Sequence, residues 1–141
     1  MRTDGRRTAR LWLLLRVAQA DVHAARQAAV AAADRHAGLE ESAERLAVAA
    51  SLEMPRRGGA ELLVQRLAFG SHVTAARRQL AAVTNTAERH AAAARQDLAV
   101  RERRRERLTR AAHAARAADH ARHLREQEHL ALLLQRRPQA R

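Results

Sequence analysis

Met54-Pro55-Arg56-Arg57-Gly58-Gly59 is the one stretch of this 141-residue sequence in which several helix-stopping features meet. Proline lacks a backbone N–H and disfavours helical geometry in the residue before it, and paired glycines supply the conformations of a chain reversal. On either side, over 11–53 and 60–135, single glycines are the strongest interruptions. The sequence therefore predicts two helices folded back on each other.

The composition favours long helices over a thick globular core. Hydrophobic residues make up 47% of the chain, but most of them are alanine, with one Trp, one Phe and no Tyr. Alanine buries little surface, so apolar burial, worth roughly 25 cal/mol per Å², has to come from scattered Leu and Val. Alanine, leucine, glutamate and arginine are strong helix formers. We expect an all-α fold of two long helices in an antiparallel coiled-coil hairpin.

The formal net charge is +12, and all 27 basic residues are arginine. A basic excess favours acidic partners: nucleic acid, anionic lipid or an acidic protein surface. The sequence has no cysteine, which excludes a disulfide framework, a thiolate nucleophile and a cysteine-based zinc site.

The first twenty residues have some features of a secretory signal. Arginines precede the apolar run 11–15, and Ala18-Gln19-Ala20 has the small-residue pattern of a cleavage site. Arg16, however, interrupts a run that is already short, and an alanine-rich sequence supplies such sites by chance. The favoured interpretation is that these residues belong to the first helix. No stretch of the sequence approaches the ~20 apolar residues of a membrane span.

The first helix, 8–53, is predicted from a heptad-like seam that follows Thr8 as N-cap. The residues 11–53 include ten charged side chains, but only one of them, Glu53, occupies a position of the seam. This distribution favours a coiled-coil seam with a period of 3.5 residues. The seam stays in phase across Gly38, so we expect one continuous helix. Its positions are Leu11, Leu15, Ala18, Val22, Ala25, Ala29, Ala32, His36, Leu39, Ala43, Leu46, Ala50 and Glu53.

The second half is predicted as a break with a short helix, 54–70, followed by a long helix, 71–136. Gly70-Ser71 offers a second reversal, so the chain turns back either near 57 or near 70. Arg136, Arg137 and Pro138 suit the C-terminal end. The expected seam includes one four-residue step after residue 87, a stutter. Its positions are Val73, Ala76, Leu80, Val83, Ala87, Ala91, Ala94, Leu98, Leu108, Ala111, Ala115 and Ala118.

Every residue from 101 to 107 is charged, so this segment presents charge on every face of a helix. We expect it to be solvated or to meet an acidic protein partner. Nucleic acid is the alternative, but aromatic residues for stacking are missing and Glu102 and Glu106 interleave the arginines. The candidate partner-binding residues are Arg101, Arg103, Arg104, Arg105 and Arg107.

The eight histidines raise the possibility of a metal site. His120 and His123, and Glu126 and His129, are each spaced to lie on one helical face. A carboxylate-bridged di-iron bundle needs two such Glu-x-x-His pairs, and this sequence has one. Surface histidines are the favoured interpretation. Phosphate-binding glycine loops and nucleophile motifs are missing, so we expect neither a cofactor nor an enzyme.

Arg10-Leu11 opening an apolar run, an alanine-rich first helix, a break near residue 60 and a long basic second helix together resemble the FliJ family. Its members are components of the bacterial flagellar type III export apparatus, and YscO is the injectisome relative. The tail 125–130, Arg-Glu-Gln-Glu-His-Leu, is similar to the family's C-terminal Arg-Glu-Gln followed by acidic residues. His129 stands where an aspartate is more typical.

This resemblance implies a non-enzymatic coiled-coil stalk in the cytoplasm, held at the inner face of the cell membrane through its partners. Those partners would be the hexameric export ATPase ring, the export gate protein and export chaperones. The alternatives from the residues alone remain a basic helical nucleic-acid-binding protein and a generic structural coiled coil.

Overall fold

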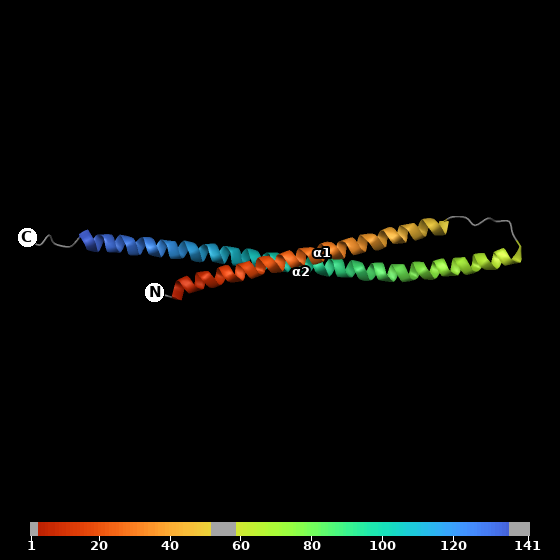
Figure 1. Cartoon of the computed structure of the whole chain (residues 1–141), viewed down its shortest axis with the longest axis horizontal. Helices are drawn as coiled ribbons and strands as arrows, with labels where there is room; N and C mark the ends of the chain where they lie inside the picture. Colours follow the sequence, from red (N-terminus) through yellow and green to blue (C-terminus); the bar gives the residue numbers. More distant parts are fainter. Residues whose placement is uncertain (1–2, 52–58, 136–141) are drawn as a thin grey trace, which may run out of the picture. The chain divides into compact units, whose positions relative to one another are not determined.

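A computed structural model describes residues 3–51 and 59–135, which form two helices, α1 (Thr3–Ser51) and α2 (Ala60–Gln135). No strand occurs in these residues, and the predicted all-α fold is confirmed (Figure 1). The helix-stopping stretch lies outside the described residues except for Gly59, as does Glu53. The carbonyl of Gly59 accepts the backbone N–H of Leu62 at 3.1 Å, which closes the first turn of α2.

The chain divides into two compact units, and each contains part of both helices. Unit 1 consists of Met1–His23 and Ala99–Arg141, and unit 2 consists of Ala24–Leu98. In each unit, therefore, a piece of α1 packs on a piece of α2.

The helices of unit 1 run antiparallel. Thr8 bonds to Asp119 and the Trp12 ring packs on His113, so residue numbers on α2 fall as those on α1 rise. Further along, Gln19 lines a groove together with Arg105.

The helices of unit 2 show the same antiparallel order. Ala28 and Ala32 share a groove with His90, whereas Leu39 shares one with Ala82 and Val83. Each unit is thus an antiparallel helix pair.

The predicted seam of α1 is confirmed throughout the described residues. None of its positions from Leu11 to Ala50 is exposed. Outside the seam, only Trp12, Asp21 and Ala47 are half-buried between residues 11 and 51. The seam residues divide into two sets: Leu15, Ala18, Val22, Ala25 and Ala29 are buried, and Leu11, Ala32, His36, Leu39, Ala43, Leu46 and Ala50 are half-buried.

Two local features of α1 were predicted with different success. The helix continues through Gly38, whose carbonyl also accepts the hydroxyl of Ser42 at 2.8 Å, so the continuous helix is confirmed. Thr8 is not the N-cap, because α1 already begins at Thr3. Its hydroxyl instead bonds across to α2.

The predicted break at Gly70-Ser71 is wrong, because α2 runs without interruption from Ala60. No described glycine has a positive φ, so nothing at Gly70 reverses the chain. The hydroxyls of Ser71 and Thr74 return to the carbonyls of Ala68 and Gly70, both at 2.8 Å, within the same helix. The separate short helix ending at 70 is therefore the first part of α2, and a reversal near 70 is excluded.

The seam of α2 corrects the predicted one. Ala76, Val83, Ala111 and Ala118 are exposed, whereas Thr84, Ala112 and Asp119 are buried or half-buried. The observed steps alternate between four and three residues from Leu80 onward, so the predicted stutter disappears. The seam positions are Leu80, Thr84, Ala87, Ala91, Ala94, Leu98, Arg101, Arg105, Leu108, Ala112, Ala115 and Asp119.

Thr84 fits a seam position because its hydroxyl donates to the carbonyl of Leu80 at 2.9 Å, which satisfies its hydrogen-bonding need within the helix. The seam as a whole is thin. Among the described residues, Leu15 and Val22 are the only buried side chains larger than alanine. Alanine lets two helices approach closely but contributes little apolar area.

Candidate partner-binding surface

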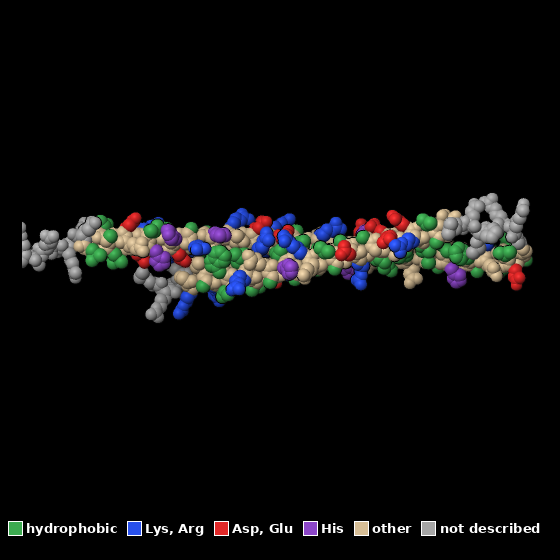
Figure 2. Space-filling model, turned by 45° about the horizontal axis from the view of Figure 1, so that its top comes forward, with side chains coloured by type: hydrophobic (Ala, Val, Ile, Leu, Met, Phe, Trp, Pro, Cys, Tyr) green, Lys and Arg blue, Asp and Glu red, His purple; other side chains and the backbone are tan. Residues whose placement is uncertain are grey.

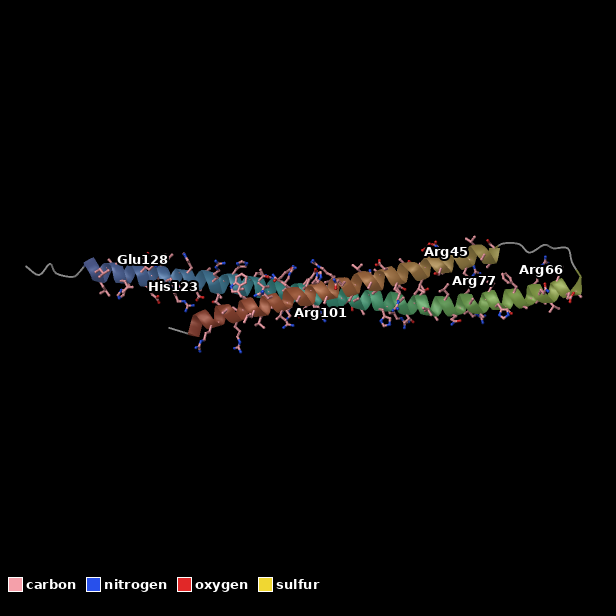
Figure 3. The ribbon with its side chains drawn as sticks, viewed as in Figure 1. Arg45, Arg66, Arg77, Arg101, His123 and Glu128 are labelled. Atoms are coloured by element: carbon pink, nitrogen blue, oxygen red, sulfur yellow. The ribbon has the colours of Figure 1, made fainter. Side chains whose placement is uncertain are left out.

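The predicted arginine cluster lies on α2 within unit 1, and the helix divides it into two sets. Arg103, Arg104 and Arg107 are exposed. Arg101 and Arg105 are half-buried at seam positions; Figure 3 labels Arg101 on α2. None of the five arginines is buried, but two of them lie at the interface between α1 and α2, which the sequence did not indicate.

The two seam arginines are compatible with a helix pair because their long aliphatic stems cover apolar surface while the guanidinium reaches water. Arg105 lines a groove of about 470 Å³ beside Gln19, and the other lining residues, Glu106, Thr109 and Arg110, belong to α2. No buried side-chain nitrogen or oxygen in the described part of the chain lacks a hydrogen-bond partner. The interface therefore admits these two arginines without stranding a buried charge.

The exposed arginines form an outward stripe. Arg103, Arg107 and Arg110 are spaced four and three residues apart, so their backbone positions share the side of α2 opposite the seam. The Arg110 side chain also borders the groove beside Gln19. Sequence reasoning missed Arg110, which lies just beyond the charged run. The same heptad spacing, extended from Arg103, identifies it. Figure 2 shows arginine side chains (blue) standing out from the helical surface.

A contact between the two helices sets the register of this surface. The Thr8 hydroxyl donates to Oδ2 of Asp119 at 2.5 Å, and the guanidinium of Arg122 donates to Oδ1 of the same carboxylate at 3.1 Å. The Trp12 and His113 rings meet edge to face, with centroids 5.6 Å apart and planes at 80°. These contacts hold residues 8–12 of α1 beside residues 113–119 of α2.

Positive charge is concentrated in unit 1. Its sequence holds seventeen arginines and seven acidic residues, a net charge of +10, whereas unit 2 holds ten arginines and eight acidic residues, a net charge of +2. Ion pairs along unit 2, such as Arg45 with Glu41, illustrate this balance. The electrostatic attraction for negatively charged molecules is therefore stronger at unit 1 than at unit 2.

The remaining polar groups show local pairings. His123 lies 3.6 Å from Glu126 on the same helix, and Figure 3 labels His123 on the C-terminal part of α2. His36, at its seam position, is half-buried and lies 3.6 Å from Glu40. No group of three or more potential metal ligands comes together among the described residues. Within the same residues, neither helix has a stretch long and apolar enough to cross a membrane.

Comparisons with protein-family models, with curated proteins and with solved structures found no match.

Proposed function

We propose that this chain is a non-enzymatic component of a bacterial flagellar or type III protein export apparatus, and that unit 1 binds an acidic surface of the export ATPase ring. The observation that carries the proposal is the charge of unit 1, +10 of the total +12, with exposed arginines on the outward side of α2. The resemblance to FliJ supplies the identity of the partner.

The chemistry of the surface suits a protein partner. Arginine presents a planar fork of donors that pairs with carboxylates in two parallel hydrogen bonds. An exposed pair contributes only about 0.2–1 kcal/mol, so several pairs have to act together. A thin, charged contact of this kind favours reversible engagement over a permanent apolar interface. Export gate proteins and chaperones are further proposed partners, and through them the chain is proposed to lie at the inner face of the cell membrane.

Charge reversal of the exposed arginines tests this proposal. We expect the triple variant R103E/R104E/R107E to bind the ATPase at least about tenfold more weakly, which corresponds to about 1.4 kcal/mol. Helix content should change little, because glutamate is also a strong helix former. The control variant R77E/R78E/R89E changes the net charge equally but on exposed residues of unit 2, where Figure 3 labels Arg77. We expect it to bind like the wild type.

Nucleic acid is the competing partner, and the same titrations distinguish it. Wild-type protein is titrated near physiological salt with the candidate ATPase, duplex DNA and single-stranded RNA. Tight DNA or RNA binding, with a log affinity that falls linearly with log salt, together with no response to the ATPase would overturn the proposal. Equal losses in the two triple variants would also overturn it, because net charge alone would then explain binding.

A further inference from the structure

The first part of α1 has a second apolar stripe that α2 does not cover. Leu13 is 62% exposed and Val17 is 57% exposed, and Ala20 is exposed as well. The buried residues Leu15 and Val22 occupy the other side of the same helix segment. At about 100° per residue, Leu13 and Val17 point away from the seam.

The spacing of the stripe is that of a second helix-packing seam. Leu13, Val17 and Ala20 are four and three residues apart, and Ala24 follows after four more. A stripe of this period is narrow and suits the side of another helix, whereas a helix lying on a membrane needs a broader apolar face. Helix segments that are apolar on two sides are typical of bundles with more than two helices.

Arginines border the stripe. Arg10 lies three residues before Leu13 and Arg16 three residues after it, which places them on opposite sides of the leucine. Arg6 precedes Leu13 by two helical turns on the same side of α1. All three are exposed. In coiled coils, charges beside the apolar seam select partners of opposite charge.

We propose that this stripe binds an amphipathic helix of a partner protein, one with leucine-type residues along its seam and acidic residues on both sides of it. Unit 1 would then form a three-helix arrangement with α1 between α2 and the partner helix. A second copy of this chain is disfavoured, because two copies of unit 1, each with a net charge of +10, would repel each other. The proposal does not depend on the proposed function, since α1 and not the arginine stripe of α2 forms the contact.

The test uses the full chain and two synthetic helical peptides. Both peptides have leucines at heptad seam positions; one has glutamates at the flanking positions and the other lysines. We expect the glutamate peptide to bind and the lysine peptide not to bind. The L13Q/V17Q variant should bind the glutamate peptide at least about tenfold more weakly, a change of about 1.4 kcal/mol. The R10Q/R16Q variant should also bind more weakly, with a reduced dependence on salt.

A matched variant controls for general loss of surface apolarity. Leu63 and Val64, on α2 in unit 2, are 61% and 64% exposed, close to the values for Leu13 and Val17. L63Q/V64Q should therefore bind the peptide like the wild type. Thermal unfolding followed by circular dichroism should be the same for both variants within about 3 °C, because exposed substitutions change stability little.

Three results would overturn the proposal. Equal losses in L13Q/V17Q and L63Q/V64Q would show that the stripe has no particular role. Binding to phosphatidylglycerol vesicles that requires Leu13, without binding to the glutamate peptide, would assign the stripe to a lipid surface. Self-association that L13Q/V17Q abolishes in sedimentation equilibrium would assign it to a second copy.

Discussion

Leu15→Ala tests whether the thin seam of unit 1 stabilises the fold. Leu15 is 3% exposed, and it is one of the two large side chains buried in the described residues. Leucine-to-alanine changes at buried sites cost about 2–5 kcal/mol. We expect roughly 2–3 kcal/mol, because a two-helix seam lies close to solvent and the residual cavity can partly collapse. Leucine and alanine have similar helix propensities, so the loss reports packing.

Thermal unfolding followed by circular dichroism measures this loss. At about 4 °C per kcal/mol, the midpoint should fall by roughly 10 °C. Leu13→Ala is the matched control, because Leu13 is two residues away but 62% exposed. It should shift the midpoint by no more than about 2 °C. Similar shifts in the two variants would refute the assignment of the seam.

Three further predictions follow from the same geometry. Leu39→Asp or Leu46→Asp places a carboxylate on the half-buried seam of unit 2 and should lower the melting temperature. Changes at exposed Glu41 or Arg45 should not. Equal effects would count against the assignment of Leu39 and Leu46 to the seam. Gly38→Ala and Gly70→Ala should each stabilise the protein by about 0.5–1 kcal/mol in urea unfolding. An added Cβ would meet no atom within 4 Å beyond the adjoining backbone of its own helix, and neither φ is positive. A loss of stability would mean that these glycines are not helical. Asp119→Ala removes the acceptor of Thr8 and Arg122 and should speed amide hydrogen exchange near residue 8, with unit 2 unchanged; unchanged exchange near residue 8 would contradict the contact.

The sequence predicted the seam of α1 well because its charged residues avoid one set of positions at alternating three- and four-residue spacing. Thirteen positions at 3,4 spacing held a single charge, and the described ones all lie in or beside the interface. The frame held across Gly38, because one glycine costs a helix only about 1 kcal/mol. The helix α2 likewise continues through Gly70. Predicting a reversal there gave too much weight to an isolated glycine.

The sequence predicted α2 less well because alanine is common on every side of it. Ala111 and Ala112 are equally apolar, and only the heptad phase selects Ala112, which is 0% exposed. That phase continues from Leu98 through Arg101 and Arg105, two positions that the predicted seam omits. The aliphatic stem of arginine is what allows it to continue.

The candidate surface was predicted only in part. Composition identified the arginines at 103, 104 and 107 as exposed charge, but the separation of Arg101 and Arg105 from them depends on the helix pairing. The concentration of charge in unit 1 also depends on the fold, because residues 1–23 and 99–141 are distant in the sequence. Neither is visible in the net charge of +12.

The helices α1 and α2 of unit 1 pair antiparallel in one register, and that register separates the seam arginines from the exposed ones. The sequence has no cysteine, so an engineered pair supplies the only thiols. The Thr8→Cys/Asp119→Cys variant should be cross-linked within one chain by a short bifunctional thiol reagent, because the Thr8 and Asp119 side chains are in contact. Thr8→Cys/Arg104→Cys, on the same two helices, should not. Rapid cross-linking of the second pair with none of the first would contradict the account.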